Sequence, residues 1–370
     1  MKIGCVKEIK KHEYRAGMTP DNVRSYISHG HMVYVEKGLG EGSALLDEEY
    51  VRAGAKVVDS AEEVWQTVDM LVKVKEPLKE EYKLMKAGQI LYTYLHLAAD
   101  PEQTKALLSS KTKSVAYETL TDKNGGLPLL KPMSEIAGRL SIQEGAKCLE
   151  KFLGGRGVLL AGVSGVEKAK IVILGGGTVG INACKIAVGM GADVTIIDLN
   201  IDRLAYLDDI FGSRIQTMYS TEGAIKAALS QADLVIGGVL IPGRTAPKLI
   251  KKEYLKDMKA GSVIVDVAVD QGGCCETTKA TYHDNPTFVV DRVVHYCVAN
   301  MPGATPRTST MALTNATLKY GLLIANNGLE KACQLESGIY NGINTYDGEC
   351  TYKNVAESLN IKYTDISLLM

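Results

Sequence analysis

The stretch from Lys170 to Asp198 constrains the fold more than any other part of the chain. It begins with an apolar, β-branched run that predicts a buried strand. A turn with the G-x-G-x-x-G spacing, at Gly175, Gly177 and Gly180, follows where a helical pattern starts. In such a turn the first glycine permits the bend, the second lets backbone N–H groups approach a diphosphate, and the third lets the helix pack on its strand. This order of elements predicts a dinucleotide-binding unit.

A second apolar run in this stretch ends in an acidic residue, Asp198, which lies 18 residues after Gly180. A carboxylate at this place can accept hydrogen bonds from both hydroxyls of an adenosine ribose, and it repels the additional phosphate of NADP. We therefore expect NAD to be the cofactor. Arg203 lies close enough along the chain to offer a cation to such a phosphate, and it therefore favours NADP.

Length and composition limit the remaining possibilities. A chain of 370 residues is long enough for two domains, and a formal net charge of -1 leaves no basic excess for nucleic acid or an anionic membrane surface. No apolar run reaches the length of a membrane span, and no signal-peptide pattern follows Met1. The eight cysteines form neither a C-x-x-C pair nor a zinc-like cluster. We expect a cytoplasmic protein with reduced thiols and no metal site.

Short strand-like runs alternate with helical patterns in the first third of the chain, and one helix is expected to begin after Thr19 as N-cap with Pro20 in its first turn. Such alternation predicts an open, largely parallel α/β sheet, in which ligands bind beyond the carboxyl ends of the strands. Arg15, Lys75 and His96 each follow a strand-like run. A guanidinium, an ammonium and an imidazole at one edge suit a small substrate that carries a carboxylate.

Each of these residues also has a plainer interpretation. Lys75 can be a solvated surface lysine, Arg15 one charge among many in a basic loop, and His96 a half-buried histidine at the end of an aromatic strand. Glu118 follows another strand-like run, and for this residue a structural role is the better interpretation. The placement of all these side chains at one edge favours a site.

Further strand and helix patterns follow the glycine turn and complete a doubly wound sheet. Ser134 is expected to cap the long helix that precedes the turn. Asp270 follows the strand-like run SVIVDVAV, again at a carboxyl edge, where it could face His96 across a cleft between domains. A long helix from Thr308 to Asn327 and a polar tail are expected to return the chain to the first domain.

Several longer segments carry a family resemblance. The segments VKEIKKHEYRAGMTP, LVKVKEP, YLHLA, AYET, LPLLKPMSEIAGR, GGGTVG, VIVDVAVDQGGC and VANMPGATPRTST occur in order along the whole chain. In them the sequence resembles the bacterial L-alanine dehydrogenases, which belong with the pyridine nucleotide transhydrogenase N-terminal family. The resemblance implies reversible oxidative deamination of L-alanine to pyruvate and ammonium with NAD, carried out by a homohexamer.

The expected fold is α/β, with two doubly wound, Rossmann-like domains that have mostly parallel sheets and are joined by long helices. Residues 1–128 and 306–370 are expected to form the substrate domain, and residues 129–305 the NAD-binding domain.

The resemblance also implies roles for individual residues. Arg15 and Lys75 would bind the substrate, and His96 and Asp270 would act in catalysis, with the carrier of the decisive proton left open. The cofactor would contact residues on the turn and on the loops of the central domain, namely Ser134, Thr178, Val179, Asp198, Arg203, Ser220, Val239, Leu240, Val267, Ala268, Val269, Asp270, Val298, Ala299, Asn300 and Met301. Lys279 stands where the family pattern usually has arginine. Because lysine lacks the planar fork, a cofactor contact there stays open.

Two other classes of function remain. One is the soluble NAD-binding component of a proton-translocating transhydrogenase, and the other is a non-catalytic NAD-binding protein that has kept the fold. Both are disfavoured because the chain carries Arg15, Lys75, His96 and Asp270 together. Such a set is unnecessary for passing a hydride between two bound cofactors.

Overall fold

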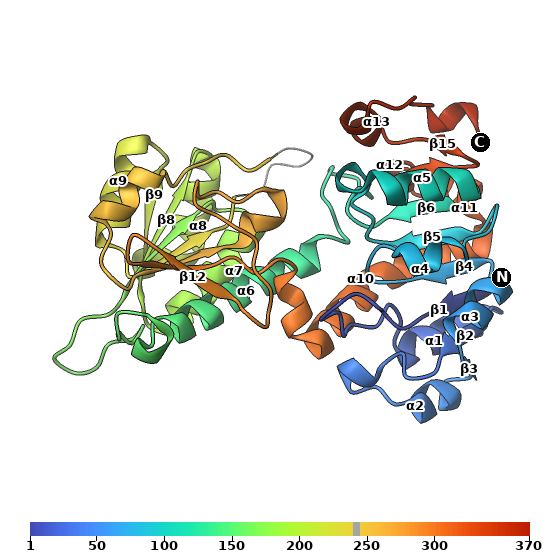
Figure 1. Ribbon diagram of the computed structural model, residues 1–370, viewed down its shortest axis with the longest axis horizontal. Helices are drawn as coiled ribbons and strands as arrows, with labels where there is room; N and C mark the ends of the chain where they lie inside the picture. Colours follow the sequence, from blue (N-terminus) through green and yellow to red (C-terminus); the bar gives the residue numbers. More distant parts are fainter. Residues whose placement is uncertain (240–244) are drawn as a thin grey trace. The chain divides into compact units, whose positions relative to one another are not determined.

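A computed structural model describes residues 1–239 and 245–370 of the chain. It divides into two compact units, the first made of Met1–Met133 and Thr305–Met370, the second of Ser134–Ala304 (Figure 1). Leu240, a predicted cofactor contact, lies outside the described residues. The chain leaves the first unit within the long helix α6 (Lys131–Cys148) and returns immediately before the long helix α10 (Pro306–Asn327).

The first unit, all of whose residues are described, is built on an eight-stranded sheet with the order β15-β14-β6-β5-β4-β1-β2-β3. Its strands are β1 (Lys2–Cys5), β2 (Met32–Glu36), β3 (Lys56–Val58), β4 (Met70–Val72), β5 (Ile90–Thr93), β6 (Lys113–Ala116), β14 (Ile343–Tyr346) and β15 (Glu349–Cys350). Its other helices are α1 (Pro20–Ser28), α2 (Asp47–Arg52), α3 (Ala61–Thr67), α4 (Lys79–Tyr82), α5 (Pro101–Ser110), α11 (Leu329–Leu335), α12 (Gly338–Gly342) and α13 (Lys353–Leu359), with short 3₁₀ turns η1 (Glu41–Ser43), η2 (Leu97–Ala99) and η8 (Ile366–Leu368).

The strands from β1 to β6 pair in parallel, and only β14 and β15 run antiparallel at one edge. Parallel strands need crossover connections, and the helices between them cover both faces of the sheet. Helix α1 begins as predicted: the Thr19 hydroxyl accepts a hydrogen bond from the backbone N–H of Asn22, and Pro20 occupies the first turn.

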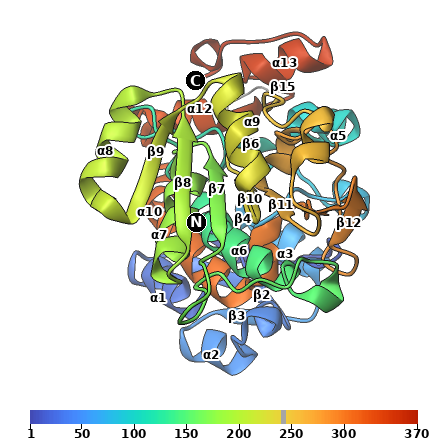
Figure 2. The same cartoon turned by 90° about the vertical axis from the view of Figure 1, so that its left-hand side faces the viewer.

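The second unit carries, over its described residues, a seven-stranded sheet with the order β12-β13-β11-β10-β7-β8-β9. Its strands are β7 (Lys170–Leu174), β8 (Asp193–Asp198), β9 (Ile215–Tyr219), β10 (Leu234–Gly237), β11 (Val263–Asp266), β12 (Thr287–Val290) and β13 (Val293–Tyr296). Besides α6, its helices are α7 (Thr178–Gly189), α8 (Ile201–Phe211) and α9 (Glu222–Gln231), with 3₁₀ turns η3 (Lys151–Leu153), η4 (Gly212–Arg214), η5 (Lys252–Asp257), η6 (Val267–Gln271) and η7 (Met301–Ala304). Figure 2 looks onto this unit, with β7 and β8 near its centre.

Alternation along β7 divides this unit into two cores. Ile171 and Ile173 pack into the core that contains residues of α6 and α7, whereas Val172 and Leu174 pack into the core that contains residues of α9. Successive side chains of a strand point to opposite faces, so a run that is apolar at every position must be covered on both sides. The predicted α/β class, with two mostly parallel doubly wound sheets, is confirmed.

The glycine turn after β7 has the geometry that its spacing predicts. Gly175 has φ +96°, a conformation that residues with a side chain rarely adopt. A Cβ atom on Gly180 would lie 1.8 Å from the carbonyl oxygen of Gly175, so only glycine lets the first turn of α7 pack this closely. A Cβ atom on Gly177 would meet nothing within 4 Å, which leaves open space beside the turn.

The sequence prediction is wrong about the start of α6, and it misses a hairpin in the polar tail. Ser134 does not cap α6, because this helix already begins at Lys131; Pro132 is tolerated there since the N–H that it lacks would be unpaired in a first turn. The polar tail contains the hairpin of β14 and β15, joined by Asp347 and Gly348, both with positive φ. The sequences of these short strands contain several polar residues, so the sequence pattern does not predict them. The pairing of β14 with β6 stabilises the hairpin.

No helix within the two described ranges is long and apolar enough to cross a membrane. All eight cysteines lie in the described part of the chain, where they are buried and unpaired.

The contact beneath Gly180 leads to a stability prediction. Gly180→Ala should destabilise the protein by about 1–3 kcal/mol or more, because the added methyl group meets backbone that cannot move aside like a side chain. Thermal or urea unfolding measures this loss. Gly189→Ala is the matched control at the other end of α7, where a Cβ atom meets nothing within 4 Å, and it should be neutral or stabilise the protein by up to about 1 kcal/mol. A Gly180→Ala protein as stable as the wild type would contradict the packing of this turn.

Candidate functional site

The strand order of the first unit creates a site at the carboxyl edge of its sheet. From β1 the chain proceeds to β2 and β3 on one side, and it then crosses to β4, β5 and β6 on the other. The loops after β1 and β4 therefore leave in opposite directions, and ligands of open α/β sheets bind where this happens. Arg15 lies in the loop after β1, and Lys75 lies in the loop after β4.

Arg15 is held by a partner that the sequence pattern did not reveal. Its guanidinium Nε donates to Oε1 of Glu13 at 2.6 Å, and its Nη2 donates to Oε2 of the same carboxylate. Both side chains are almost fully buried, with exposed fractions of 1% and 0%. Burial opposes ionisation of Arg15, but Glu13 outweighs this effect and raises the pKa of the guanidinium. The arginine is thus charged and has a defined orientation.

The loop that carries Lys75 is fixed by buried charges. Oε1 of Glu8 accepts from the backbone N–H groups of Val74 at 2.7 Å and of Lys75 at 3.2 Å, and Oε2 of Glu8 lies 3.2 Å from Nζ of Lys73. The Lys73 ammonium also donates to Glu81 at 2.9 Å. Burial raises the pKa of Glu8, although the ammonium of Lys73 opposes this shift.

A second link joins the same two loops. Lys10, in the loop after β1, forms an ion pair with Glu76, the neighbour of Lys75. Burial would raise the pKa of Glu76, but Lys75 and Lys10 together outweigh burial and lower it. The loops that carry Arg15 and Lys75 are therefore connected by charged side chains as well as by the sheet.

His96 follows β5 and is held in an unusual backbone conformation. Its φ is +52°, in the left-handed region, and its backbone N–H donates to Oε1 of Glu118 at 2.6 Å. The same carboxylate accepts from the N–H of Leu95 and lies 3.8 Å from Nδ1 of the His96 ring. The ring stacks on Tyr94 with 6.0 Å between centroids, and its side chain is 47% exposed. Such over-determined backbone conformations cluster at functional sites.

Tyr94 is close to both His96, on which its ring stacks, and Arg15. Burial raises the pKa of its hydroxyl, and the charge of Arg15 acts against this rise. One unit therefore carries Arg15, Lys75 and His96 on loops at one sheet edge, as the sequence predicts. Glu8, Glu13 and Tyr94 were missed. Glu13 stands two positions before Arg15, and Tyr94 stands two positions before His96. Residues two positions apart in an extended segment point to the same side, and this spacing was the signal that could have identified both.

The second unit has the same reversal of strand order, now beside β7. The chain proceeds from β7 to β8 and β9 on one side and then to β10 and β11 on the other. At the reversal a Cβ atom on Gly175 would lie 3.1 Å from the carbonyl oxygen of Gly238 and from a methyl group of Val239. Most predicted cofactor contacts that the structure describes follow strands of this sheet at their carboxyl ends: Gly175, Gly177, Thr178, Val179, Gly180, Asp198, Ser220, Val239, Val267, Ala268, Val269, Asp270, Val298, Ala299, Asn300 and Met301.

Asp198 ends β8 beside the glycine turn. Its Oδ2 accepts from the backbone N–H of Gly176, and its Oδ1 accepts from that of Asn200 at 2.8 Å. Each carboxylate oxygen has two lone pairs, so both can accept a further hydrogen bond. Arg203 donates from Nε to the carbonyl oxygen of Gly176, and its guanidinium lies over the ring of Tyr206.

Ser134 and Lys279 are not in this set and lie elsewhere in the second unit. Ser134 lies in α6. Lys279 is exposed, and it stands two residues before Thr281, which forms a β-bridge with Val298. Asp270 is exposed in η6, because β11 already ends at Asp266 and the predicted strand SVIVDVAV is shorter than expected. Asp270 belongs to the second unit and His96 to the first.

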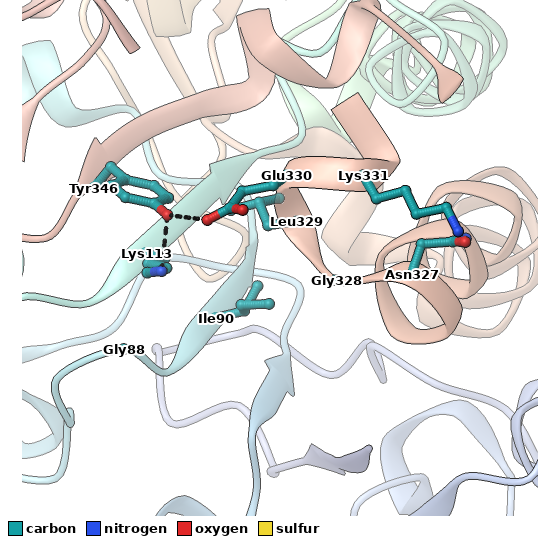
Figure 3. Close-up of a pocket in the computed structure, with 9 residues that line it drawn as sticks. All are labelled: Gly88, Ile90, Lys113, Asn327, Gly328, Leu329, Glu330, Lys331 and Tyr346. Carbon is teal, nitrogen blue, oxygen red and sulfur yellow. Dashed lines mark hydrogen bonds between the residues drawn. The ribbon is translucent and has the colours of Figure 1, made fainter. Parts of the chain in front are cut away.

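A cavity of about 330 Å³ lies at the other edge of the first sheet (Figure 3). It is lined by residues at the starts of β5 and β6, the end of α10, and parts of α11 and β14. Its polar side chains bind one another, since Nζ of Lys113 and the Tyr346 hydroxyl are 2.9 Å apart and this hydroxyl lies 3.1 Å from Glu330. No predicted site residue lines this cavity, so we place the functional site at the carboxyl edges.

The sequence matches two family descriptions. Residues 4–137 match "Alanine dehydrogenase/PNT, N-terminal domain", and residues 141–353 match "Alanine dehydrogenase/PNT, C-terminal domain". The alanine dehydrogenase of Methanococcus maripaludis is 57% identical over 98% of each chain, and that of Halomonas elongata is 50% identical over 100% of each chain.

Solved structures agree with these matches. A structure of an L-alanine dehydrogenase has a TM-score of 0.95 and 51% identity, and it covers 97% of this chain and 99% of that chain. A transhydrogenase structure from Sinorhizobium meliloti has a TM-score of 0.81 at 22% identity and covers 95% of this chain and 99% of that chain, which shows a shared fold.

The buried charges around Lys73 lead to a second prediction. Lys73→Met should destabilise the protein by about 3–5 kcal/mol, because it leaves the carboxylates of Glu8 and Glu81 without their counter-ion. The pKa of Glu8, already raised, should rise further. A raised carboxyl pKa favours folding at low pH, and this contribution is lost as the pH rises through the folded-state pKa. The loss of stability should therefore be larger at pH 8 than at pH 5.

Urea unfolding at both pH values measures this effect. Lys79→Met removes an exposed ion pair with Glu102 and should leave stability nearly unchanged at either pH. A Lys73→Met protein that loses no more stability than this control would show that the buried charges are not coupled as described.

Proposed function

The chain belongs to the alanine dehydrogenase/pyridine nucleotide transhydrogenase family, and we propose that it catalyses the reversible oxidative deamination of L-alanine to pyruvate and ammonium with NAD. The observation that carries this proposal is the match to alanine dehydrogenases at 50–57% identity over nearly the whole chain. We further propose a homohexamer as its assembly.

Arg15 and Lys75 are the proposed substrate-binding residues. The planar guanidinium of Arg15 can hold the substrate carboxylate through two parallel hydrogen bonds, which fixes the position of the α-carbon. The ammonium of Lys75 can stabilise negative charge that develops on the oxygen of pyruvate or of the carbinolamine. The buried partners of both loops support this proposal, because they limit the movement of the two cations.

His96 and Asp270 are the proposed catalytic residues. An imidazole can accept and donate a proton, as water adds to the iminium and as the carbinolamine releases ammonia. Glu118 supports this role for His96, because its carboxylate binds the backbone of His96 and lies near Nδ1. Asp270 can hold the ammonium group or orient the attacking water.

The residues of the second unit fit NAD. Gly177 is the N-cap of α7 and offers no capping side chain, and open space lies beside it. The first N–H groups of this helix can therefore bind a diphosphate. Asp198 stands where a carboxylate binds the ribose hydroxyls. When bound, NAD supplies the hydride acceptor for the hydrogen on the α-carbon of L-alanine. The other proposed contacts, including Arg203 and Lys279, stay predictions.

Spectrophotometric assay of the purified chain with NAD tests the proposed reaction. We expect formation of NADH with L-alanine, and its oxidation with pyruvate and ammonium. Deamination releases one proton, so its apparent equilibrium constant should rise about tenfold per pH unit, equivalent to ~1.4 kcal/mol. Transfer of hydride between two nucleotides without dependence on alanine would instead identify a transhydrogenase component.

The roles of His96 and Asp270 can be tested by substitution. His96→Ala should lower kcat by roughly 10²- to 10⁴-fold, which is the usual contribution of a positioned proton-transfer group. Asp270→Asn should behave similarly, because the amide neither carries charge nor accepts a proton. NADH titration by fluorescence should show that the His96→Ala variant still binds the cofactor, and that the Asp270→Asn variant does so provided that this carboxylate is not itself a major cofactor contact. A His96→Ala enzyme with near-normal kcat would remove this residue from the mechanism.

Cofactor preference gives a further prediction. Asp198 should make kcat/KM for NAD exceed that for NADP by a factor of hundreds, since each tenfold corresponds to ~1.4 kcal/mol and a desolvated charge clash costs a few kcal/mol. Asp198→Ser should reduce this ratio by at least about tenfold, because it removes the repulsion. The control is Asp202→Ser, because Asp202 is an exposed acidic residue in the first turn of α8. This variant should leave the ratio unchanged. Equal efficiency of the wild type with both cofactors would contradict the role of Asp198.

A further inference from the structure

Glu13 and Arg15, a proposed substrate-binding residue, form an almost fully buried ion pair. The exposed fraction of the Glu13 side chain is 0%, and that of Arg15 is 1%. Nε and Nη2 of Arg15 both donate to this carboxylate, one to each oxygen. The backbone N–H of Arg15 also donates to Oε1 of Glu13, at 3.2 Å. One carboxylate therefore fixes both the guanidinium plane and the backbone from which it projects.

This contact decides which edge of the guanidinium a second carboxylate can use. A guanidinium has five N–H groups in a fixed planar fork and forms its strongest contacts through pairs of parallel hydrogen bonds. Glu13 binds the edge formed by Nε and Nη2. A substrate carboxylate that forms two parallel hydrogen bonds would have to use the other edge, formed by Nη1 and Nη2; the sulfur of Met133 lies 3.1 Å from Nη1.

Stability alone is a weak explanation for such a pair. Removing two charges from water costs several kcal/mol per ion, so apolar residues of similar size often stabilise a protein as well or better. An exposed arginine could carry the same charge without Glu13, but its flexible side chain would then lose rotamer freedom when it binds a substrate. With Glu13 in place, the guanidinium is already oriented, which lowers the cost of binding.

We propose that Glu13 is a positioning residue that fixes the Arg15 guanidinium and thereby sets the orientation in which the substrate carboxylate binds. This proposal rests on the proposed function, in which Arg15 binds the carboxylate of L-alanine or pyruvate. Glu13 itself does not touch the substrate and acts through Arg15. Its removal should therefore weaken substrate binding more than it slows the chemical step, and it should have no effect once the guanidinium is absent.

The experiment is a double-mutant cycle with Glu13→Gln, Arg15→Lys and the double variant. Steady-state kinetics in both directions give KM and kcat, and fluorescence titration gives the affinity for NADH. In the Glu13→Gln variant the new amide nitrogen would face an N–H donor of Arg15, so the guanidinium would lose one of its two parallel hydrogen bonds. We expect KM for L-alanine and pyruvate to rise about 10- to 100-fold, the scale of a small misplacement in a site. We expect kcat to change less than about threefold, because the lost interaction serves binding.

The cycle separates an effect through Arg15 from a general one. In the Arg15→Lys background, Glu13→Gln should raise KM no further, because no guanidinium remains to be positioned. Additive effects on KM would overturn the proposal. Glu13→Asp keeps the charge with a shorter side chain and should raise KM less than Glu13→Gln does, and it serves as the test if Glu13→Gln does not fold. An unchanged KM in a folded Glu13→Asp or Glu13→Gln enzyme would also overturn the proposal.

A matched control measures the loss of a buried carboxylate by itself. Asp233→Asn removes a buried carboxylate from the second unit, where Asp233 is 7% exposed and lies 3.0 Å from both Arg156 and Lys259, two partly exposed cations. It should lower the melting temperature and leave KM unchanged. A wild-type chain without alanine-dependent NADH formation would overturn the proposed function, and the role of Glu13 with it. An active wild type in which Arg15→Lys raises KM but Glu13→Gln does not would overturn the role of Glu13 alone.

Discussion

The reversal of strand order beside β1 and beside β7 is the constraint on which the rest of the structure depends. All strands that flank each reversal are parallel, so their carboxyl ends lie at one edge of the sheet. The two loops that leave this edge in opposite directions cannot cover it. In the first unit these loops carry Arg15 and Lys75, and in the second they carry the glycine turn and Val239. The same topological feature therefore places both sets of predicted contacts.

Buried charged side chains hold the loops at this edge of the first sheet. Glu8 binds backbone N–H groups of the loop after β4, and Lys73 balances its charge. Glu13 holds Arg15 in the same loop from which Glu8 projects. Buried carboxylates are costly unless they are paired and hydrogen-bonded. The pairing seen here keeps that cost moderate, and it gives each loop a defined conformation in return.

His96 shows the same principle at a single residue. Its left-handed backbone is unfavourable for a residue with a side chain, and the structure keeps it because Glu118 accepts hydrogen bonds from two successive N–H groups. The sequence pattern favoured a structural role for Glu118, and its backbone contacts are of that kind. Because its carboxylate also lies near the ring of His96, the structural contact and the proposed chemistry meet at one residue.

The sequence by itself determined the α/β class, the strand, turn and helix around Gly175 to Gly180, the cap at Thr19, and the set of polar residues that follow strands. These features depend on local periodicity and backbone geometry, which neighbouring residues specify. The family resemblance rests on the same local segments. Only the tertiary structure decided that Glu8 binds the loop of Lys75, which lies 67 positions away, and that β14 pairs with β6. Hydrogen bonds between distant residues depend on the order of strands in a sheet, and local sequence preferences do not specify that order.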